Sequence, residues 1–290
     1  MRRLSLLLVC AALIAGALPA RAEPLKVVAT FSILGDLVRN VGGNRVDVST
    51  LVGPDSDAHV YSPTPADAKK IADAKLIVVN GLGFEGWLPR LVQSSGSKAR
   101  IVTTSDGITP LRLGTDADPH AWQSVNNAKI YVANISHALA AADPAAAEQF
   151  MANTQAYLAK LDALDREVRD AVSKLPPARR KVISTHSAFG YFAASYGIEF
   201  IAPLGVSTES EPSARDVAKI ITQIKQAKIP AVFLENVTDP RLVQRISAET
   251  GAKVGGTLYS DGLTGEKGDA PTYIDMVRHN IKALTRALGD

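Results

Sequence analysis

Short apolar runs rich in β-branched residues alternate along the chain with segments whose apolar residues recur at helical spacing. This alternation is typical of a mainly parallel sheet covered by helices, because the connection between two parallel strands is usually a helix. In the first half of the chain, the pattern predicts strands at residues 26–31, 46–52, 76–80 and 100–104. It predicts helices at residues 33–41, 65–74, 85–94 and 124–142, with Ser124 as a candidate N-cap.

One long helix is predicted at residues 144–175. This stretch contains no Gly, is rich in good helix formers, and carries apolar residues at helical spacing, namely Phe150, Tyr157, Leu161, Leu164, Val168 and Val172. Pro176 and Pro177 end it, because proline cannot continue a helix. A second α/β series follows, with strands predicted at 181–184, 199–201, 231–234 and 253–258, and helices at 188–196, 213–228, 240–250 and 272–288.

The expected fold is therefore α/β, with two similar lobes that are joined by one long rigid helix. Each lobe is expected to contain a mainly parallel sheet with flanking helices. The expected boundaries are 23–143 for the N-terminal lobe, 144–175 for the linking helix and 176–290 for the C-terminal lobe.

The first 22 residues have the pattern of a secretory signal peptide. Arg2 and Arg3 precede an apolar stretch from residue 4 to 18, and the segment ends in Ala20-Arg21-Ala22. A membrane span needs about 20 consecutive apolar residues, and Pro19 and Arg21 interrupt this run. We therefore expect cleavage after Ala22 and a periplasmic protein. Lipid attachment at Cys10 is the alternative, although the apolar stretch before it, residues 4–9, is short.

Composition and charge exclude several classes of protein. Of the 290 residues, 46% are hydrophobic and 21% are charged, as in ordinary folded proteins. Residues 1–22 hold three of the 32 basic residues and none of the 29 acidic ones, so the remainder is formally neutral. Nucleic-acid binding is not expected, since no stretch interleaves basic and aromatic residues. Cys10 is the only cysteine, so disulfides are not expected either.

Four side chains with metal-binding chemistry lie in loops at the ends of apolar runs, namely His59, His120, His186 and Asp261. They are 61 to 75 residues apart, so only tertiary folding can assemble them into one site. Ligands of open α/β sheets bind beyond the carboxyl ends of the strands, which predicts a site between the lobes. Three imidazoles and one carboxylate suit a borderline ion such as zinc, whereas calcium and magnesium prefer oxygen ligands.

Other polar residues receive supporting or structural interpretations. Asp57, Asp118 and Glu235 lie where they can accept the second ring N–H of a ligating histidine. His137 and His279 lie inside predicted helices, and we interpret both as structural.

Residues 81–86 read GLGFEG and match the G-x-G-x-x-G fingerprint of dinucleotide-binding proteins. The match follows the third predicted strand rather than the first, and Glu85 would repel a pyrophosphate. We therefore interpret the glycines as a tight turn between a strand and a helix. Nucleophilic catalysis has little support, since the chain has no G-x-S-x-G motif.

Seven segments, in this order, resemble the solute-binding proteins of ABC importers for zinc and manganese, the cluster A-I type with a rigid helical backbone. They are DSDAHVYSPTP (55–65), GLGFEGWL (81–88), DPHAW (118–122), HSAFGYFAASYG (186–197), EPSARD (211–216), FLEN (233–236) and GTLYSDGL (256–263). The resemblance covers essentially the whole chain after residue 22. It implies capture of a divalent ion outside the cytoplasm and delivery to a membrane permease that a cytoplasmic ATPase powers.

Carried over residue by residue, the resemblance makes His59 and His120 the ligands of the first lobe, and His186 and Asp261 those of the second. The third position is often Glu in manganese binders and His in zinc binders, so His186 favours Zn²⁺ over the alternatives Mn²⁺ and iron(II). One departure is that residues 108–119 contain no His, whereas many zinc members carry a long His-rich loop there. The chain is expected to be a monomer whose partners are the metal ion and the permease subunit.

Two other classes of function remain open at this point. A secreted zinc hydrolase needs an open coordination position and a general base, and the chain has no H-E-x-x-H motif to supply that base. A metal-dependent adhesin would show a retained anchor or a large exposed apolar patch. For a binding protein, the long helix should resist hinge bending, so residues 208–213, a polar segment, are the candidate for the element that moves on metal release.

Overall fold

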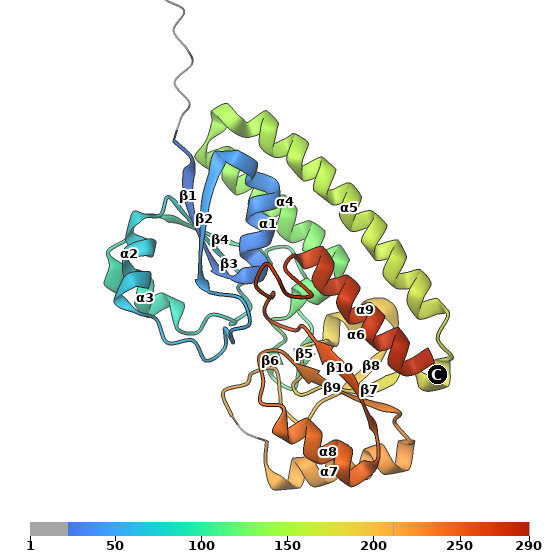
Figure 1. The fold of residues 1–290 in the computed structure, drawn as a ribbon. Coiled ribbons are helices and arrows are strands. Elements are labelled where there is room, and N and C mark those ends of the chain that lie inside the picture. The colour runs from blue at the N-terminus through green and yellow to red at the C-terminus, as the bar shows by residue number, and fades with distance from the viewer. Residues whose placement is uncertain (1–22, 211, 290) are drawn as a thin grey trace, which may run out of the picture.

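The computed structural model describes residues 23–210 and 212–289, and Figure 1 shows their arrangement. The expected signal peptide, residues 1–22, lies outside the described residues. Among the helices of the described part, none has both the length and the apolar character needed to cross a membrane.

The first lobe is built on four parallel strands in the order β2-β1-β3-β4, namely β1 (Leu25–Phe31), β2 (Val46–Val52), β3 (Leu76–Val79) and β4 (Arg100–Thr103). Successive residues of a strand point to opposite faces, and both faces are buried. Val27 and Ala29 pack toward α1 (Ser32–Gly42) and α4 (Val125–Ala142). Val28 packs toward α2 (Pro65–Asp73) and α3 (Leu88–Ser95). The nearly continuous apolar strands therefore follow from helices on both faces.

The second lobe repeats this plan with strand order β10-β9-β7-β8, namely β7 (Lys181–Ile183), β8 (Glu199–Ile201), β9 (Ala231–Glu235) and β10 (Lys253–Leu258). Helices α7 (Ala214–Ala227) and α8 (Arg241–Thr250) cover one face. Helices α6 (Gly190–Tyr196) and α9 (Tyr273–Gly289) pack on the other. The predicted fold class, with two α/β lobes, is confirmed.

The long helix α5 (Ala147–Ser173) runs along both lobes, as Figure 1 shows. At about 1.5 Å per residue, its 27 residues span about 40 Å. Its predicted apolar positions, from Phe150 to Val172, are buried in a core that continues from the first lobe into the second. The helix is flanked by 3₁₀ turns at Pro144–Ala146 and Pro177–Arg179, and another short turn lies at Gly43–Arg45.

Helices α5 and α6 begin two to three residues later than predicted, and the starts of α3 and α4 show physical reasons for such differences. Helix α3 begins at Leu88 rather than at residue 85, because the buried Glu85 carboxylate accepts hydrogen bonds from the backbone N–H of Asn80 (2.6 Å) and Gly81 (3.2 Å). Gly81 and Gly83 have φ of 85° and 82°, so the predicted tight turn is confirmed. Ser124 lies at the N-cap position of α4, but its side chain makes no capping bond and instead accepts one from Ser195 Oγ (2.9 Å).

A small antiparallel hairpin, β5 (Arg112–Leu113) and β6 (Asp116–Ala117), was not predicted. Strands of two residues are too short to show an alternating pattern. From the sequence we expected His120 to follow the last strand of the first sheet directly. The hairpin instead lies between β4 and His120. The backbone N–H of Asp118 donates to the carbonyl of Leu111 (2.8 Å), which fixes the chain as it enters the segment with His120.

Candidate metal centre

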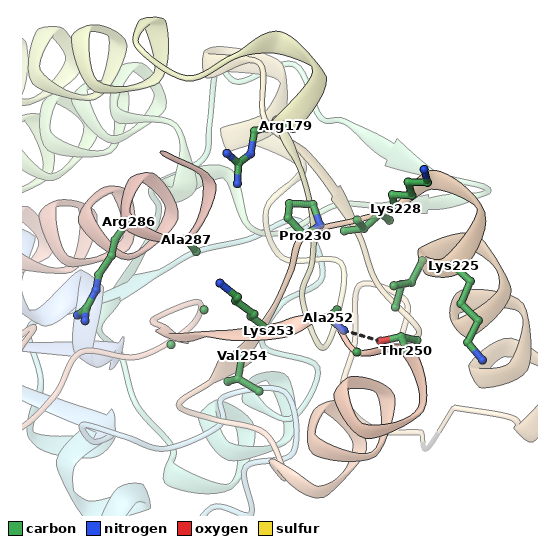
Figure 2. A pocket seen from close by; sticks show the side chains of 15 residues that line it. Arg179, Lys225, Lys228, Pro230, Thr250, Ala252, Lys253, Val254, Arg286 and Ala287 are labelled. Carbon is green, nitrogen blue, oxygen red and sulfur yellow. Dashed lines mark hydrogen bonds between the residues drawn. The ribbon is translucent and has the colours of Figure 1, made fainter. Parts of the chain in front are cut away.

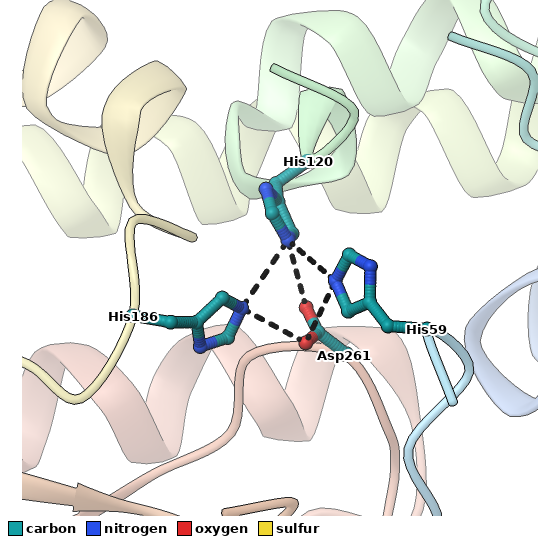
Figure 3. A group of neighbouring side chains, drawn as sticks. All are labelled: His59, His120, His186 and Asp261. Atoms are coloured by element: carbon teal, nitrogen blue, oxygen red, sulfur yellow. Dashed lines mark hydrogen bonds and ion pairs between the residues drawn. The ribbon is translucent and has the colours of Figure 1, made fainter. Parts of the chain in front are cut away.

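The structure brings the four predicted ligands together between the lobes, and Figure 3 shows their side chains converging. One ligand atom from each residue lies within 4.8 Å of the others. Nε2 of His120 lies 3.3 Å from Nε2 of both His59 and His186. Oδ2 of Asp261 lies 3.1 Å from Nε2 of His186. All four residues are buried.

Each ligand lies on a loop that its own lobe places at the cleft. His59 follows β2, and His186 and Asp261 follow β7 and β10 at the carboxyl ends of these strands. His120 immediately precedes the 3₁₀ turn Ala121–Gln123 at the start of α4. The other two described histidines do not join them: His137 is exposed on α4, and Nε2 of His279 lies 3.0 Å from the carbonyl of Thr257.

Buried carboxylates orient two of the imidazoles. Oδ1 of Asp118 lies 2.7 Å from Nδ1 of His120, and Oε2 of Glu235 lies 2.6 Å from Nδ1 of His186. We assign the ring proton of His120 to Nδ1 because the carboxylate of Asp118 accepts it there, and that of His186 to Nδ1 because this atom lies in ion-pair contact with Glu235. In each ring Nε2 then faces the cluster, where its lone pair is free to bind an ion once the ring is neutral, as expected for Asp118 and Glu235 from the sequence.

Asp57 acts on His59 in a different way from the one predicted. Its Oδ1 accepts a hydrogen bond from the backbone N–H of His59 (2.8 Å), in a turn that Asp commonly forms with the residue two positions later. Its Oδ2 accepts one from Thr208 Oγ1 (2.6 Å). The ring of His59 packs edge-on against Phe84, with centroids 4.7 Å apart.

Asp261 has the donor chemistry and the environment of a cation ligand. Both of its carboxylate oxygens are buried, and no residue in the described part of the chain donates a hydrogen bond to them. Burial would raise its pKa, but the imidazoles of His186 and His120 outweigh burial and hold the pKa below its usual range. An ionised carboxylate without water or a donor needs a positive charge beside it. The residues present therefore fit a cation.

The imidazoles differ in how readily they hold a proton. Burial lowers the pKa of His59 to about 4, so this ring is neutral at physiological pH. Burial would also lower the pKa of His186, but the carboxylates of Glu235 and Asp261 outweigh it and raise the pKa well above the usual value. In the metal-free protein a proton therefore sits on His186, and it has to leave when an ion binds.

Hydrogen bonds between the lobes hold the segment with Asp261, and the sequence did not reveal them. Trp122 Nε1 and Gln123 Nε2 both donate to the carbonyl of Ser260, at 2.9 and 2.7 Å. The backbone N–H of Leu263 donates to Ser32 Oγ in α1 (2.9 Å). The sequence signal for these bonds was that Trp122 and Gln123 closely follow His120 in the chain. It could not identify the acceptor, the carbonyl of Ser260, which lies about 140 residues later.

A separate hollow of about 860 Å³, drawn in Figure 2, is lined by Arg179, Lys225, Lys228, Lys253 and Arg286. It lies by the amino ends of β9 and β10, away from the metal cluster. The ends of α7, α8 and α9 meet there, and cations near helix C-termini stabilise the exposed carbonyl groups. The helix ends account for Lys225, Lys228 and Arg286, and the described residues that line the hollow include no His, Cys, Asp or Glu to bind a metal ion.

Comparison with known proteins agrees with this geometry. Residues 27–287 match the family model described as zinc-uptake complex component A, periplasmic. The chain is 37% identical to the iron-binding protein YfeA of Yersinia pestis, over 92% of this chain and 88% of that protein. It is 34% identical to the manganese-binding lipoprotein MntA of Halalkalibacterium halodurans, over 92% and 89% of the two chains. The solved structure of the periplasmic zinc-binding protein TroA of Treponema pallidum matches with a TM-score of 0.87 and 33% identity, covering 92% of this chain and 99% of that one.

The match spans nearly all of the described chain, and relatives and structure agree on the same two-lobed plan. Members of this family bind and hand over their ligand without chemical conversion, so the hydrolase interpretation is set aside. The chain belongs to the family of periplasmic component A of zinc-uptake complexes, and it is a metal-binding solute-binding protein of an ABC importer.

Proposed function

We propose that the protein captures Zn²⁺ and delivers it to the permease of its importer, with His59, His120, His186 and Asp261 as ligands. The spacing of the ligand atoms around His120 supports zinc, whereas Nε2 of His59 lies 3.7 Å from Oδ2 of Asp261, farther than a tetrahedral site requires. Tetrahedral zinc binds nitrogen at about 2.0–2.1 Å, which requires ligand atoms about 3.3–3.4 Å apart. The distances from Nε2 of His120 to its neighbours in the cluster are 3.3, 3.3 and 3.4 Å.

Manganese is the alternative that a specific observation favours. Oδ1 of Asp261 lies 3.4 Å from Nε2 of His120, while Oδ2 lies 3.1 Å from Nε2 of His186, so both oxygens face the cluster. A carboxylate that binds through both oxygens raises the coordination number and suits an ion with a preference for oxygen. The relatives named above bind iron, manganese or zinc, so their names do not choose among these ions.

The remaining parts of the proposal concern organisation and location. We take residues 23–143 and 176–290 as the two lobes and 144–175 as the segment that links them, since each lobe contains one four-stranded parallel sheet and the link contains the long helix. The protein acts as a monomer outside the cytoplasm, in the periplasm, because the ion has to be captured before it crosses the membrane.

Metal identity is the first test. Protein purified without added metal is expected to contain one zinc per chain by elemental analysis. In a competition titration, zinc is expected to displace manganese, because three imidazoles favour the ion later in the affinity order of divalent metals. Manganese or iron in the purified protein, together with failure of zinc to displace it, would show that the proposed metal is wrong.

Ligand assignment is tested by His120→Ala. Loss of one of four ligands is expected to weaken zinc binding by more than the roughly 10–100-fold that loss of an orienting partner costs. The matched control is His137→Ala, which removes an exposed imidazole from α4 and should leave the affinity unchanged. Titration calorimetry measures both. Full affinity in His120→Ala would refute the assignment.

Affinity should depend on pH through His186. Its raised pKa means that the proton is held in the metal-free protein, so lower pH favours the metal-free form. We expect zinc affinity to weaken about tenfold per unit as the pH falls from about 7.5 to about 5, because one proton competes with the ion. Proton release on zinc addition, measured in weakly buffered solution, should approach one per ion. An affinity that stays flat over this range contradicts a histidine-based site.

Processing of the N-terminus is expected to follow the signal-peptide pattern, because the sequence Ala20-Arg21-Ala22 ends the apolar stretch. The intact mass of the exported protein should correspond to a chain that begins at Glu23. Cys10→Ser should leave that mass unchanged. A mass that includes residues 10–22 and a lipid would instead show attachment at Cys10; the relative MntA is named a lipoprotein.

A further inference from the structure

The four proposed ligands are not equally buried, and the difference locates the exit from the site. His120, His186 and Asp261 have no exposed surface, whereas His59 is 8% exposed and its neighbour Val60 is 52% exposed. An ion that leaves the cluster therefore passes the turn that carries His59. Contacts that hold this turn control the exit.

A strap of irregular chain, residues 202–210, reaches this turn from the second lobe. Its beginning is fixed to the loop after His186, since the Ser187 backbone N–H donates to the carbonyl of Gly205 (2.9 Å) and Ser187 Oγ donates to that of Leu204 (3.0 Å). Further along, Thr208 Oγ1 donates to Asp57 Oδ2 across the cleft, at 2.6 Å.

The same Asp57 carboxylate also bonds the backbone of a proposed ligand. Its other oxygen, Oδ1, accepts the hydrogen bond from the backbone N–H of His59 (2.8 Å). One carboxylate therefore connects the backbone of His59, in the first lobe, to the strap of the second. A hollow of about 410 Å³ that is lined by Asp57, Thr185, Leu204 and Thr208 gives the strap space to move.

The rest of the turn is held independently of Thr208. The backbone N–H of Asp55 donates to the carbonyl of Leu263 in the second lobe (2.9 Å), and Trp87 Nε1 donates to the carbonyl of Ala58 (2.8 Å). The continuous helix α5 also ties the lobes together. Breaking the bond between Thr208 and Asp57 can therefore free the strap while the lobes stay in place.

We propose that Thr208 and Asp57 are positioning residues, and that the hydrogen bond between them is a latch that sets how fast the bound divalent cation leaves. This inference rests on the proposed function of the same site. The latch acts through His59. While the hydrogen bond is formed, the strap stays against the turn and His59 keeps its position. When the bond breaks, the turn can carry His59 away from the ion.

The test is Thr208→Val, which removes the hydroxyl and keeps the shape of the side chain. Zinc dissociation from the loaded full-length protein, followed by stopped flow into excess chelator, is expected to become about tenfold faster, as loss of one hydrogen bond to a charged acceptor predicts. Thr208→Ser keeps the hydroxyl and should restore a slow rate. Thr238→Val is the matched control, because Thr238 lines the same hollow but its hydroxyl bonds within its own lobe, to the carbonyl of Glu235 (3.5 Å).

Two further measurements separate a latch from general destabilisation. The melting temperature of the metal-free protein should fall by no more than about 4 °C in Thr208→Val, as the loss of one hydrogen bond predicts. The double variant Asp57→Asn/Thr208→Val should release zinc no faster than the faster single variant, because both changes break one bond. A Thr208→Val rate within about twofold of the wild type, or additive effects in the double variant, overturns the latch. A wild-type protein that binds no divalent ion overturns the proposed function itself, so the two failures are distinguishable.

Discussion

The structure depends on compensating one negative charge that is buried where the two lobes meet. Asp261 is fully buried, its pKa is lowered by the neighbouring imidazoles, and its oxygens lie 3.1 Å from Nε2 of His186 and 3.4 Å from Nε2 of His120. Removing such a carboxylate from water costs several kcal/mol unless a positive charge accompanies it. A proton on His186 or a bound cation can supply that charge. The imidazoles also have to be held in one orientation. The carboxylates of Asp118 and Glu235 do this by contacting Nδ1 of His120 and His186, which turns both Nε2 atoms toward one point.

Such a cluster can form only if the lobes hold a fixed relative position. The core continues from the first lobe through α5 into the second, and the indole of Trp122 is bonded to the carbonyl beside Asp261. Because the ligands are placed before the ion arrives, little of the binding energy is lost to ordering them. Rigidity between the lobes also confines movement to loops. We therefore expect the binding and release of the ion to depend on short segments around His59 and His186 more than on movement of whole lobes.

The sequence predicted the features that arise from local pattern. Strands and helices lie within about three residues of their predicted bounds, because alternating and helical periodicities record which face each segment buries. The four proposed ligands were recognisable because they lie in loops at strand ends, where ligands of open α/β sheets bind. Features that need a distant partner were not predictable. The Glu85 carboxylate accepts hydrogen bonds from Asn80 and from Thr30 on a different strand. The side chain of Ser124 bonds to Ser195 instead of capping α4. Asp57 accepts a hydrogen bond from Thr208, which lies 151 residues later in the chain.

The last helix also has a consequence for the order in which the chain matures. Helix α9 belongs to the second lobe by sequence, yet it packs against α1 and α5, and the backbone N–H of Tyr273 at its start donates to the buried carboxylate of Asp36 in α1 (2.9 Å). The first lobe thus lacks part of its core until the final seventeen residues of α9 arrive. We therefore expect the first lobe to complete its core only after α9 has packed against it, unlike a tandem domain that folds alone. The two lobes share this helix, so neither is an independent folding unit.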